Sequence, residues 1–416
     1  MRIDIIGTGY VGLTLGIALS RTSHEVVCWD INKNLIDNLK KGITDVEEPF
    51  INEYLQEGRE KNNLIFKHID EGETGEFCIV SVGTSIKDCT IKSRMSSIEN
   101  IIQNLINCSA KYIVLRSTVS VGLTRRFHKL WGEKVDFIYA PERTVEGCAI
   151  EELGTLPQII AFNNSRAKQK AIDCFSELGV ELLMSDTWEE AELAKLLCNT
   201  YRDYNFAFSN QAAFICRSIN LDIYKVNLLA SHDYDRFPSL KPGPVSGPCL
   251  TKDTKILSSS FENCSTELLE KARDINSEVN KIAVRDIKRI IDIHLIDKNK
   301  ILIVGLGFKS KPPTGDTRDS HSIDIALTLI EEGYEISYYD PLVDTDGKNL
   351  LKNRDIEDLE EKDFDLVIFP ITPSWVLNKI EDPSSKINNA IRYWLYKPNN
   401  LQSNNKDYFF GDYRNF

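Results

Sequence analysis

The 416-residue sequence predicts an α/β protein in which two parallel-sheet domains are joined by one long central helix. Residues 1–185 alternate short β-branched runs with amphipathic stretches, as expected for a parallel sheet with helices on both faces. Residues 187–219 then show helical spacing of apolar side chains without a proline or glycine. A strand-like pattern starts again at residue 300, which indicates a second sheet.

The predicted elements follow in chain order. Strands of the first domain are expected at residues 3–6, 25–29, 77–82, 112–115 and 136–139. The helix at 187–219 is too long for a crossover between strands, so we expect it to connect two domains. A loop-rich segment (231–253) and a second long helix (265–293) precede strands at 301–304, 335–339 and 366–369. We expect domain boundaries that give segments 1–185, 186–295 and 296–416.

Charge and cysteine content argue against several classes of protein. The 50 Lys and Arg against 62 Asp and Glu give a net charge of −12, which disfavours a nucleic-acid partner held through its phosphates. The ten cysteines include no close pair at metal-ligand spacing and no dense disulfide framework. No apolar stretch approaches the length of a membrane span. We therefore expect a cytoplasmic protein with reduced thiols, no bound metal and no membrane partner.

A glycine-rich turn follows the first predicted strand and opens a helix. It reads Gly7-Thr-Gly9-Tyr10-Val11-Gly12, the fingerprint of a Rossmann-like dinucleotide-binding domain. The first glycine permits the tight turn, the second lets a pyrophosphate approach the backbone, and the third lets the helix pack on the strand. The helix N-terminus then faces the negative charge of the phosphates.

Polar residues at further strand ends complete the predicted cofactor site. Asp30 ends the second strand, 18 residues beyond Gly12, where an acid accepts the hydroxyls of the adenosine ribose. Because an acid there disfavours the extra phosphate of NADP, we predict NAD; the alternative is an ordinary turn acid. Thr84, Ser117 and Thr118 follow two other strands and would line the nicotinamide side of the cleft.

A loop rich in glycine and proline, residues 241–253, delivers the most reactive candidate side chain. Cys249 lies in this loop three residues before Lys252, whose charge would favour the thiolate. Most cysteines are small core residues, and that reading remains the alternative for Cys249. Its occurrence in one chain with a dinucleotide fingerprint favours a nucleophile.

Taken together, the motifs resemble the nucleotide-sugar 6-dehydrogenases, the UDP-glucose/GDP-mannose dehydrogenase family. The matching stretches are the 7–12 fingerprint, Ser117-Thr-Val, Pro141-Glu-Arg with Glu146-Gly, Ala191-Glu-Leu-Ala-Lys195 with Asn199, Cys249-x-x-Lys-Asp253, Phe308-Lys309 and Thr314-Gly-Asp-Thr-Arg318. This resemblance implies oxidation of a sugar's C6 alcohol to a carboxylate, with two NAD reduced per sugar. It also implies a homodimer formed through the central segment.

The resemblance implies a role for each central residue. Cys249 would add to the aldehyde, so that a thiohemiacetal gives up a second hydride and leaves a thioester for water to cleave. Glu142 would act through water or as a base, with Glu146 as its neighbour, and we expect their mutual repulsion to raise one pKa towards neutrality. Thr118 is a further candidate catalytic residue at the end of its strand.

Helix spacing supports the oxyanion site that the resemblance implies. Lys195 and Asn199 are four residues apart and therefore share one helix face. They would stabilise the developing oxyanion and hold a water that Asp253 helps to activate. A salt-bridged structural lysine is the alternative for Lys195.

The resemblance places the nucleotide at the last domain. Lys309 and Arg318 would meet the uridine diphosphate, since two phosphates in an acidic protein need placed cations, and Lys252 would contact the substrate. Arg236 matches an arginine that in many members reaches the substrate of a neighbouring subunit. Arg143, where UDP-glucose enzymes commonly have phenylalanine, favours a UDP-N-acetylhexosamine used in surface polysaccharide synthesis.

Three other functions stay open at this point. UDP-glucose is the alternative substrate within the family. A β-hydroxyacid-type dehydrogenase also places a long helix after a dinucleotide domain, but it gives no reason for Cys249 or for the last domain. A non-catalytic nucleotide-binding protein is the third alternative, against which the intact set of Cys249, Lys195 and Glu142 argues.

Overall fold

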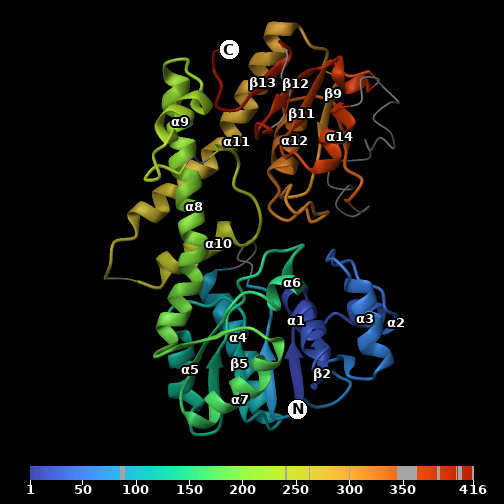
Figure 1. The fold of residues 1–416 in the computed structure, drawn as a ribbon, viewed down its shortest axis with the longest axis vertical. Coiled ribbons are helices and arrows are strands. Elements are labelled where there is room, and N and C mark those ends of the chain that lie inside the picture. The colour runs from blue at the N-terminus through green and yellow to red at the C-terminus, as the bar shows by residue number, and fades with distance from the viewer. Residues whose placement is uncertain are drawn as a thin grey trace. The chain divides into compact units, whose positions relative to one another are not determined.

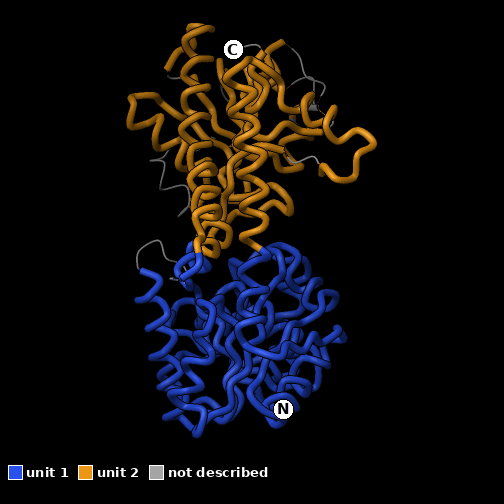
Figure 2. The backbone as a smooth tube through the Cα atoms, turned by 90° about the vertical axis from the view of Figure 1, so that its left-hand side faces the viewer, with its two compact units in different colours: residues 1–198, 255–264 blue, residues 199–254, 265–416 orange. Residues whose placement is uncertain are grey.

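The computed structural model describes residues 1–84, 90–238, 241–261, 263–298, 300–343, 363–381, 385–399, 401 and 405–414. The chain forms two compact units, shown in different colours in Figure 2. The first comprises Met1–Cys198 and Lys255–Cys264, and the second Asn199–Thr254 and Ser265–Phe416. Each unit holds one Rossmann-like sheet, and the long helix α8 (Trp188–Ser218) runs from the first into the second, which confirms the predicted fold class (Figure 1).

The first unit is built on an eight-stranded sheet in the order β3-β2-β1-β4-β5-β6-β7-β8. The strands are β1 (Arg2–Ile6), β2 (Glu25–Asp30), β3 (Leu64–His68), β4 (Phe77–Val80), β5 (Tyr112–Leu115), β6 (Asp136–Tyr139), β7 (Gln158–Phe162) and β8 (Leu182–Ser185). Among the described strand pairs of this sheet, only β6–β7 is antiparallel. The strand order reverses between β1 and β4, and the carboxyl ends at such a switch point form the ligand crevice of this fold.

Helices cover both faces of this sheet. They are α1 (Tyr10–Ser20), α2 (Lys33–Lys41), α3 (Ile51–Glu60), α4 (Ile91–Asn107), α5 (Leu123–Trp131), α6 (Ala149–Leu153) and α7 (Ser165–Phe175). Strand residues alternate between two cores, because successive side chains point to opposite faces. Val114 of β5 packs in the core of α1, α2, α3 and α7, whereas Ile113 and Leu115 pack in that of α4 and α5.

The second unit combines long helices with a five-stranded parallel sheet in the order β10-β9-β11-β12-β13. The strands are β9 (Ile301–Val304), β10 (Ile336–Tyr339), β11 (Leu366–Phe369), β12 (Ile391–Trp394) and β13 (Asp407–Phe409). The helices are α9 (Ile223–Ser231), α10 (Leu250–Ser259, whose last five residues belong to the first unit), α11 (Glu267–His294), α12 (His321–Glu331) and α14 (Ser374–Glu381). One core joins α8, α11 and α12 to the sheet, and a second lies beneath α14.

The predicted strands lie within two residues of the observed ones, and the long helices agree equally well. The loop-rich prediction for 231–253 differs at its end, because α10 begins at Leu250. Cys249 therefore immediately precedes a helix. Over the described parts of the chain, no helix has both the length and the apolar character needed to span a membrane.

Candidate active site

The three fingerprint glycines meet three different physical demands. Gly7 has a φ of +93°, and a Cβ there would lie 2.8 Å from the carbonyl oxygen of Ser81. A Cβ at Gly12 would collide with the carbonyl oxygen of Gly7, so the third glycine is needed where α1 passes the turn. Around Gly9 no atom lies within 4 Å of the Cβ position, so the backbone at this helix N-cap is open to a ligand.

Asp30 is fixed against the fingerprint turn. Its carboxylate accepts a hydrogen bond from the backbone N–H of Thr8 at 2.8 Å and another from that of Asn32 at 2.9 Å. A carboxylate has about four acceptor positions, so capacity remains for hydroxyl donors. This geometry is compatible with the predicted ribose contact.

The polar residues after β4 and β5 lie on adjacent strands beyond the switch point. Thr84 and Ser117 are buried, and Thr118 is half-buried. The Ser117 hydroxyl donates to the carbonyl oxygen of Val82 at 2.8 Å, which ties the two strand ends together. This hydrogen bond fixes the position of the turn after β5 that carries Thr118.

Glu142 lies at the start of the acid loop, residues 141–148, which follows β6. Its carboxylate accepts from the guanidinium of buried Arg116 and from the backbone N–H groups of Arg143 at 2.7 Å and Thr144 at 2.8 Å. Burial by itself raises the pKa of Glu142, but the charge of Arg116 and these hydrogen bonds outweigh it and lower that pKa below its ordinary value. The direction is opposite to the one expected from repulsion between two acids, and Glu142 is a carboxylate at neutral pH.

A second acid, Glu48, secures the other half of the acid loop. Its carboxylate accepts from the backbone N–H of Gly147 at 2.5 Å, from that of Ala149 at 3.1 Å, and from the hydroxyl of Tyr10. The loop that carries Glu146 is thereby tied to the fingerprint. Nothing in the sequence distinguishes Glu48 from the many other acids, and its role depends on a contact across about a hundred residues.

In the second unit, Cys249 is exposed and stands at the N-terminus of α10. Its carbonyl oxygen accepts from the N–H of Asp253 at 3.0 Å, the first hydrogen bond of the helix. Asp253 is fully buried and accepts from Asn199 Nδ2 and from Lys252 Nζ, each at 2.7 Å. The structure therefore brings together four of the predicted site residues: Asn199, Cys249, Lys252 and Asp253.

Lys252 remains a cation in this cluster. Burial lowers the pKa of Lys252, but the neighbouring carboxylate of Asp253 and, to a lesser degree, Cys249 raise it, and the result lies above the ordinary value for lysine. Lys252 therefore contributes a buried positive charge to this cluster.

Lys195 is buried one helical turn before Asn199 on α8. Nearby on the same helix, Glu192 accepts from the N–H groups of Gly122 at 2.6 Å and Thr124 at 2.9 Å, at the start of α5. Burial raises the pKa of Glu192 to about 7. Sequence reasoning missed Glu192, although its place three residues before Lys195 was a signal that it shares that face.

The residues predicted to bind the nucleotide, Phe308-Lys309 and 314–318, follow β9 in the second unit. Phe308 lies against the cysteine loop, residues 241–249. A Cβ at Gly247 would come within 2.8 Å of the ring of Phe308, which is followed by Lys309. The guanidinium of Arg318 is exposed and pairs with the carboxylate of Asp316, with Nε at 2.8 Å. Lys309 and Arg318 therefore come from the turn and the loop that follow β9.

The remaining predicted residues are distributed between the units. Glu142, Glu146, Thr118 and Lys195 belong to the first unit. Arg236 belongs to the second, where its side chain is exposed and its guanidinium lies 5.8 Å from the ring centroid of Tyr234.

Comparison with known proteins shows to which protein family the chain belongs. Residues 1–179 match the NAD binding domain of the UDP-glucose/GDP-mannose dehydrogenase family, residues 189–278 its central domain, and residues 302–371 its UDP binding domain. The chain belongs to this family. It is an NAD-dependent oxidoreductase, and its last domain is the UDP-binding domain of a UDP-sugar dehydrogenase.

Individual relatives carry two different substrate names. A UDP-N-acetyl-D-mannosamine dehydrogenase of Methanococcus maripaludis is 27% identical over 82% of this chain and 80% of its own. A UDP-glucose 6-dehydrogenase of Rickettsia bellii is 29% identical over 86% and 84%. The solved UDP-D-ManNAc dehydrogenase of Pyrococcus horikoshii has a TM-score of 0.83 at 23% identity, with full coverage of both chains, and supports the fold.

Proposed function

We propose that this dehydrogenase oxidises the C6 alcohol of a UDP-N-acetylhexosamine, of the N-acetylmannosamine or N-acetylglucosamine type, to a carboxylate. The product would be a nucleotide-linked uronic acid for surface polysaccharide synthesis. The observation that carries the proposal is the cluster of Cys249 with Asn199, Lys252 and Asp253 in an NAD-dependent chain with a UDP-binding domain. A simple alcohol dehydrogenase has no use for a cysteine beside a buried cation.

The first oxidation removes two electrons. The C6 hydroxyl would lose its proton to a base, and NAD, held by the fingerprint turn and Asp30, would supply the two-electron acceptor that leaves the aldehyde. We assign Lys195 and Asn199 to the oxygen that carries the developing negative charge, because they occupy one buried face of α8. Thr118, from the rigid turn after β5, would contact the nicotinamide side.

The second oxidation needs the cysteine. The Cys249 sulfur forms a bond to the aldehyde carbon and the carbonyl oxygen takes a proton, which gives a thiohemiacetal. Loss of that proton and transfer of hydride to a second NAD leave a thioester and NADH. Water then cleaves the carbon–sulfur bond, which yields the carboxylate and returns the thiol.

Proton transfer in the hydrolysis is assigned to the acids. Asp253 would orient a water together with Asn199, which donates to it at 2.7 Å. Glu142, held as a carboxylate by Arg116, would accept a proton from water, with Glu146 on the same loop. Lys252 would balance the negative charge on sulfur and oxygen.

The choice of sugar rests on the acid loop and on the relatives. Arg143 directly follows Glu142 in the acid loop, and its guanidinium donates to the carbonyl oxygen of Pro157. Several relatives of comparable identity are named as N-acetylmannosamine enzymes. UDP-glucose is the second candidate, because the Rickettsia bellii relative is named for it.

An exposed apolar face on α8 supports a homodimer. Tyr201, Phe208 and Ile215 recur every seven residues on this helix and are each more than half exposed. Such a stripe is the pattern of a helix seam that a second copy covers. With the chain paired in this way, exposed Arg236 would reach the partner's substrate.

A panel of UDP-sugars with NAD tests the reaction. We expect two NADH per molecule of UDP-N-acetylmannosamine or UDP-N-acetylglucosamine. One NADH per sugar would support a β-hydroxyacid-type reaction, and binding of NAD without any turnover would support a non-catalytic protein. Highest kcat/KM with UDP-glucose would overturn the choice of sugar.

Replacing Cys249 with serine tests the covalent step. Cys249→Ser is expected to lower the rate of carboxylate formation by at least about a thousandfold, because a serine hydroxyl is a poor nucleophile without a strong base. The replacement of exposed Cys198 by serine is the matched control. Acid production by Cys249→Ser at the wild-type rate would rule out the thioester.

A further inference from the structure

A chain of buried polar side chains lies beneath the cysteine loop in the second unit. Its members come from three helices: Asp203 and Asn210 from α8, Thr254 from α10, and Asn276 with Arg273 from α11. Each is at most 8% exposed, and Asp203, Asn210 and Asn276 are fully buried. Buried polar groups are normally kept for a structural or functional reason, because they must all find partners.

The chain of polar side chains, called the polar chain below, binds the beginning of the cysteine loop through hydrogen bonds. Asn210 Oδ1 accepts from the N–H of Gly243 at 2.8 Å, and Asn210 Nδ2 donates to the carbonyl oxygen of Gly243 at 3.0 Å. The same Nδ2 donates to Asn276 Oδ1 at 2.9 Å. One amide side chain therefore satisfies both backbone groups of a loop residue and passes the contact on to α11.

The polar chain also binds the segment that follows the cysteine. Asn276 Nδ2 donates to Asp203 Oδ1 at 2.8 Å, and Arg273 donates to the same oxygen at 2.7 Å. The other carboxylate oxygen of Asp203 accepts from the hydroxyl of Thr254 at 3.1 Å. Thr254 directly follows Asp253, the residue that binds Asn199 and Lys252.

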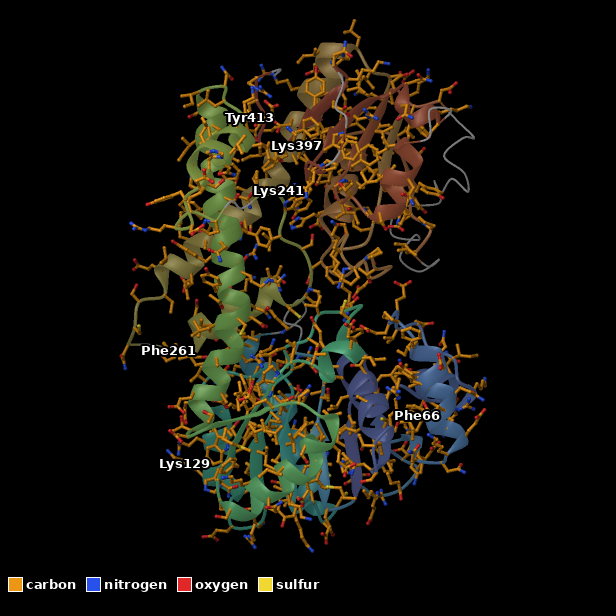
Figure 3. All side chains as sticks on the ribbon, viewed as in Figure 1. Phe66, Lys129, Lys241, Phe261, Lys397 and Tyr413 are labelled. Carbon is orange, nitrogen blue, oxygen red and sulfur yellow. The ribbon has the colours of Figure 1, made fainter. Side chains whose placement is uncertain are left out.

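We propose that Asn210, Asn276, Asp203 and Thr254 are positioning residues that hold Cys249 in place for the second oxidation. Cys249 lies six residues after Gly243 and five before Thr254, so the polar chain closes a short ring around it. Within this unit the loop has other supports, among them the bond from Lys241 Nζ to the carbonyl oxygen of Lys397 at 2.9 Å, whose residues Figure 3 labels. The Thr251 hydroxyl also donates to the carbonyl oxygen of Gly247 at 3.1 Å, which links the two flanks of the cysteine locally. The polar chain differs in that it anchors both flanks to α8 and α11.

This inference rests on the proposed role of Cys249, and it predicts a selective defect. Attack on the aldehyde requires the sulfur within a few tenths of an ångström of its working place, and a displacement of about 1 Å can cost about a hundredfold in rate. The first hydride transfer does not use the sulfur. Loss of the polar chain should therefore slow capture of the aldehyde and leave the first step and sugar binding little changed.

The matched variants are Thr254→Val and Thr254→Ser. Valine keeps the shape of threonine but loses its hydroxyl, whereas serine keeps the hydroxyl. For Thr254→Val we expect a second oxidation about tenfold slower or more, KM within about twofold, and aldehyde that an added amine reagent can trap. Thr254→Ser should restore two NADH per sugar without trapped aldehyde.

A second readout does not depend on turnover. The rate of Cys249 alkylation by iodoacetamide, followed on its own peptide by mass spectrometry, should fall about threefold or more in Thr254→Val, because the thiol moves away from Lys252. Exposed Cys198 is the internal control and should not change. Asn210→Ala interrupts the other end of the polar chain and should show the same two effects. It provides the test if Thr254→Val does not fold.

The outcomes separate the two proposals. If wild type makes two NADH per sugar but Thr254→Val and Asn210→Ala match it in kinetics and in alkylation, the positioning role is wrong while the function stands. If wild type oxidises no UDP-sugar, the proposed function fails. In that event, equal alkylation of the valine and serine variants would also refute the positioning of Cys249.

Discussion

At the scale of single residues, the buried ion pair between Arg116 and Glu142 decides how the acid loop can act. Arg116 is itself held by Gln158 Oε1 at 2.6 Å and by the carbonyl oxygen of Ala140 at 3.1 Å, so its position is fixed before any ligand binds. A buried carboxylate with such a partner stays ionised. In the proposed mechanism this charge state suits Glu142 to accept a proton from water.

Removal of the Arg116 charge should shift the pH dependence of turnover. In Arg116→Met, burial of Glu142 loses its largest opposing interaction and only the backbone hydrogen bonds from Arg143 and Thr144 remain. Its pKa therefore rises, and the acid limb of the kcat profile moves to higher pH by about one unit or more. Arg116→Lys, which retains the charge, should move the limb less. A pH–rate series for the three proteins measures this, and coincident acid limbs would exclude the ion pair from catalysis.

Folding stability should respond to the same pair with a defined sign. The pKa of Glu142 is lowered in the folded protein, so its contribution to stability is present above the ordinary carboxyl pKa and is lost as pH falls through the lower folded value. Wild type should therefore lose more stability between pH 6 and pH 3 than Arg116→Met does.

The fingerprint glycines offer a matched pair of substitutions. Gly9→Ala meets no atom, so the fold should be unchanged while NAD binds about tenfold more weakly, because the new Cβ enters the phosphate site. Gly12→Ala collides with the Gly7 carbonyl and should lower stability by about 1–3 kcal/mol. Thermal unfolding and NAD titration of both variants measure this. If Gly9→Ala and Gly12→Ala lose equal stability, then Gly9 is required for packing of the fold and not for access of the phosphates.

At the scale of elements, α8 buries polar side chains together with apolar ones. The buried polar side chains are Glu192, Lys195, Asn199, Thr200, Asp203, Ser209 and Asn210. Buried polar groups normally need partners, and Asn199, Asp203 and Asn210 find theirs in α10, α11 and the cysteine loop. The carboxylate of Glu192 serves in this way as the cap of α5.

The Glu192 cap should make stability depend on pH near neutrality. Burial raises its pKa from 4.5 to about 7, so the folded state favours the protonated acid. This contribution is full below pH 4.5 and is lost as pH rises through about 7, by up to about 3 kcal/mol. Chemical denaturation of wild type and Glu192→Gln at pH 5 and pH 8 tests this. Glu192→Gln should show a smaller difference in the free energy of unfolding between the two pH values than wild type. An equal difference would mean that another group titrates.

At the scale of the whole molecule, assembly should depend on the apolar face of α8. Phe208→Glu places a charge on that stripe and should convert the proposed dimer to a monomer, because burying an unpaired carboxylate in an interface is costly. Leu130→Glu on α5, with 54% exposure against 52% for Phe208, is the matched control. Sedimentation velocity measures the state. A dimer that survives Phe208→Glu would place the interface elsewhere.

Much of the architecture is predictable because its signals are local. Apolar periodicity located α8 and α11, and β-branched runs located β5, β6, β9 and β11 to the residue. Five strands escaped prediction: β3, β7, β8, β12 and β13. The edge strand β8 is half exposed and lacks a continuous buried run. The start of α10 also escaped, because four residues after a proline-rich loop carry no periodicity and the helix is held by contacts to α8.

The sequence by itself determined the fold class, the NAD fingerprint and the family, and it marked Cys249 as the residue to explain. Each of these depends on residue types at short, fixed spacings, which local backbone geometry preserves. Only the tertiary structure decided that Arg116 binds Glu142, that Glu48 ties the acid loop to Tyr10, and that Asn210 binds Gly243 before Cys249 while Asp203 binds Thr254 after it. Those contacts join residues far apart in the chain, and pairing of buried charges and amides depends on distances that no one-dimensional pattern records.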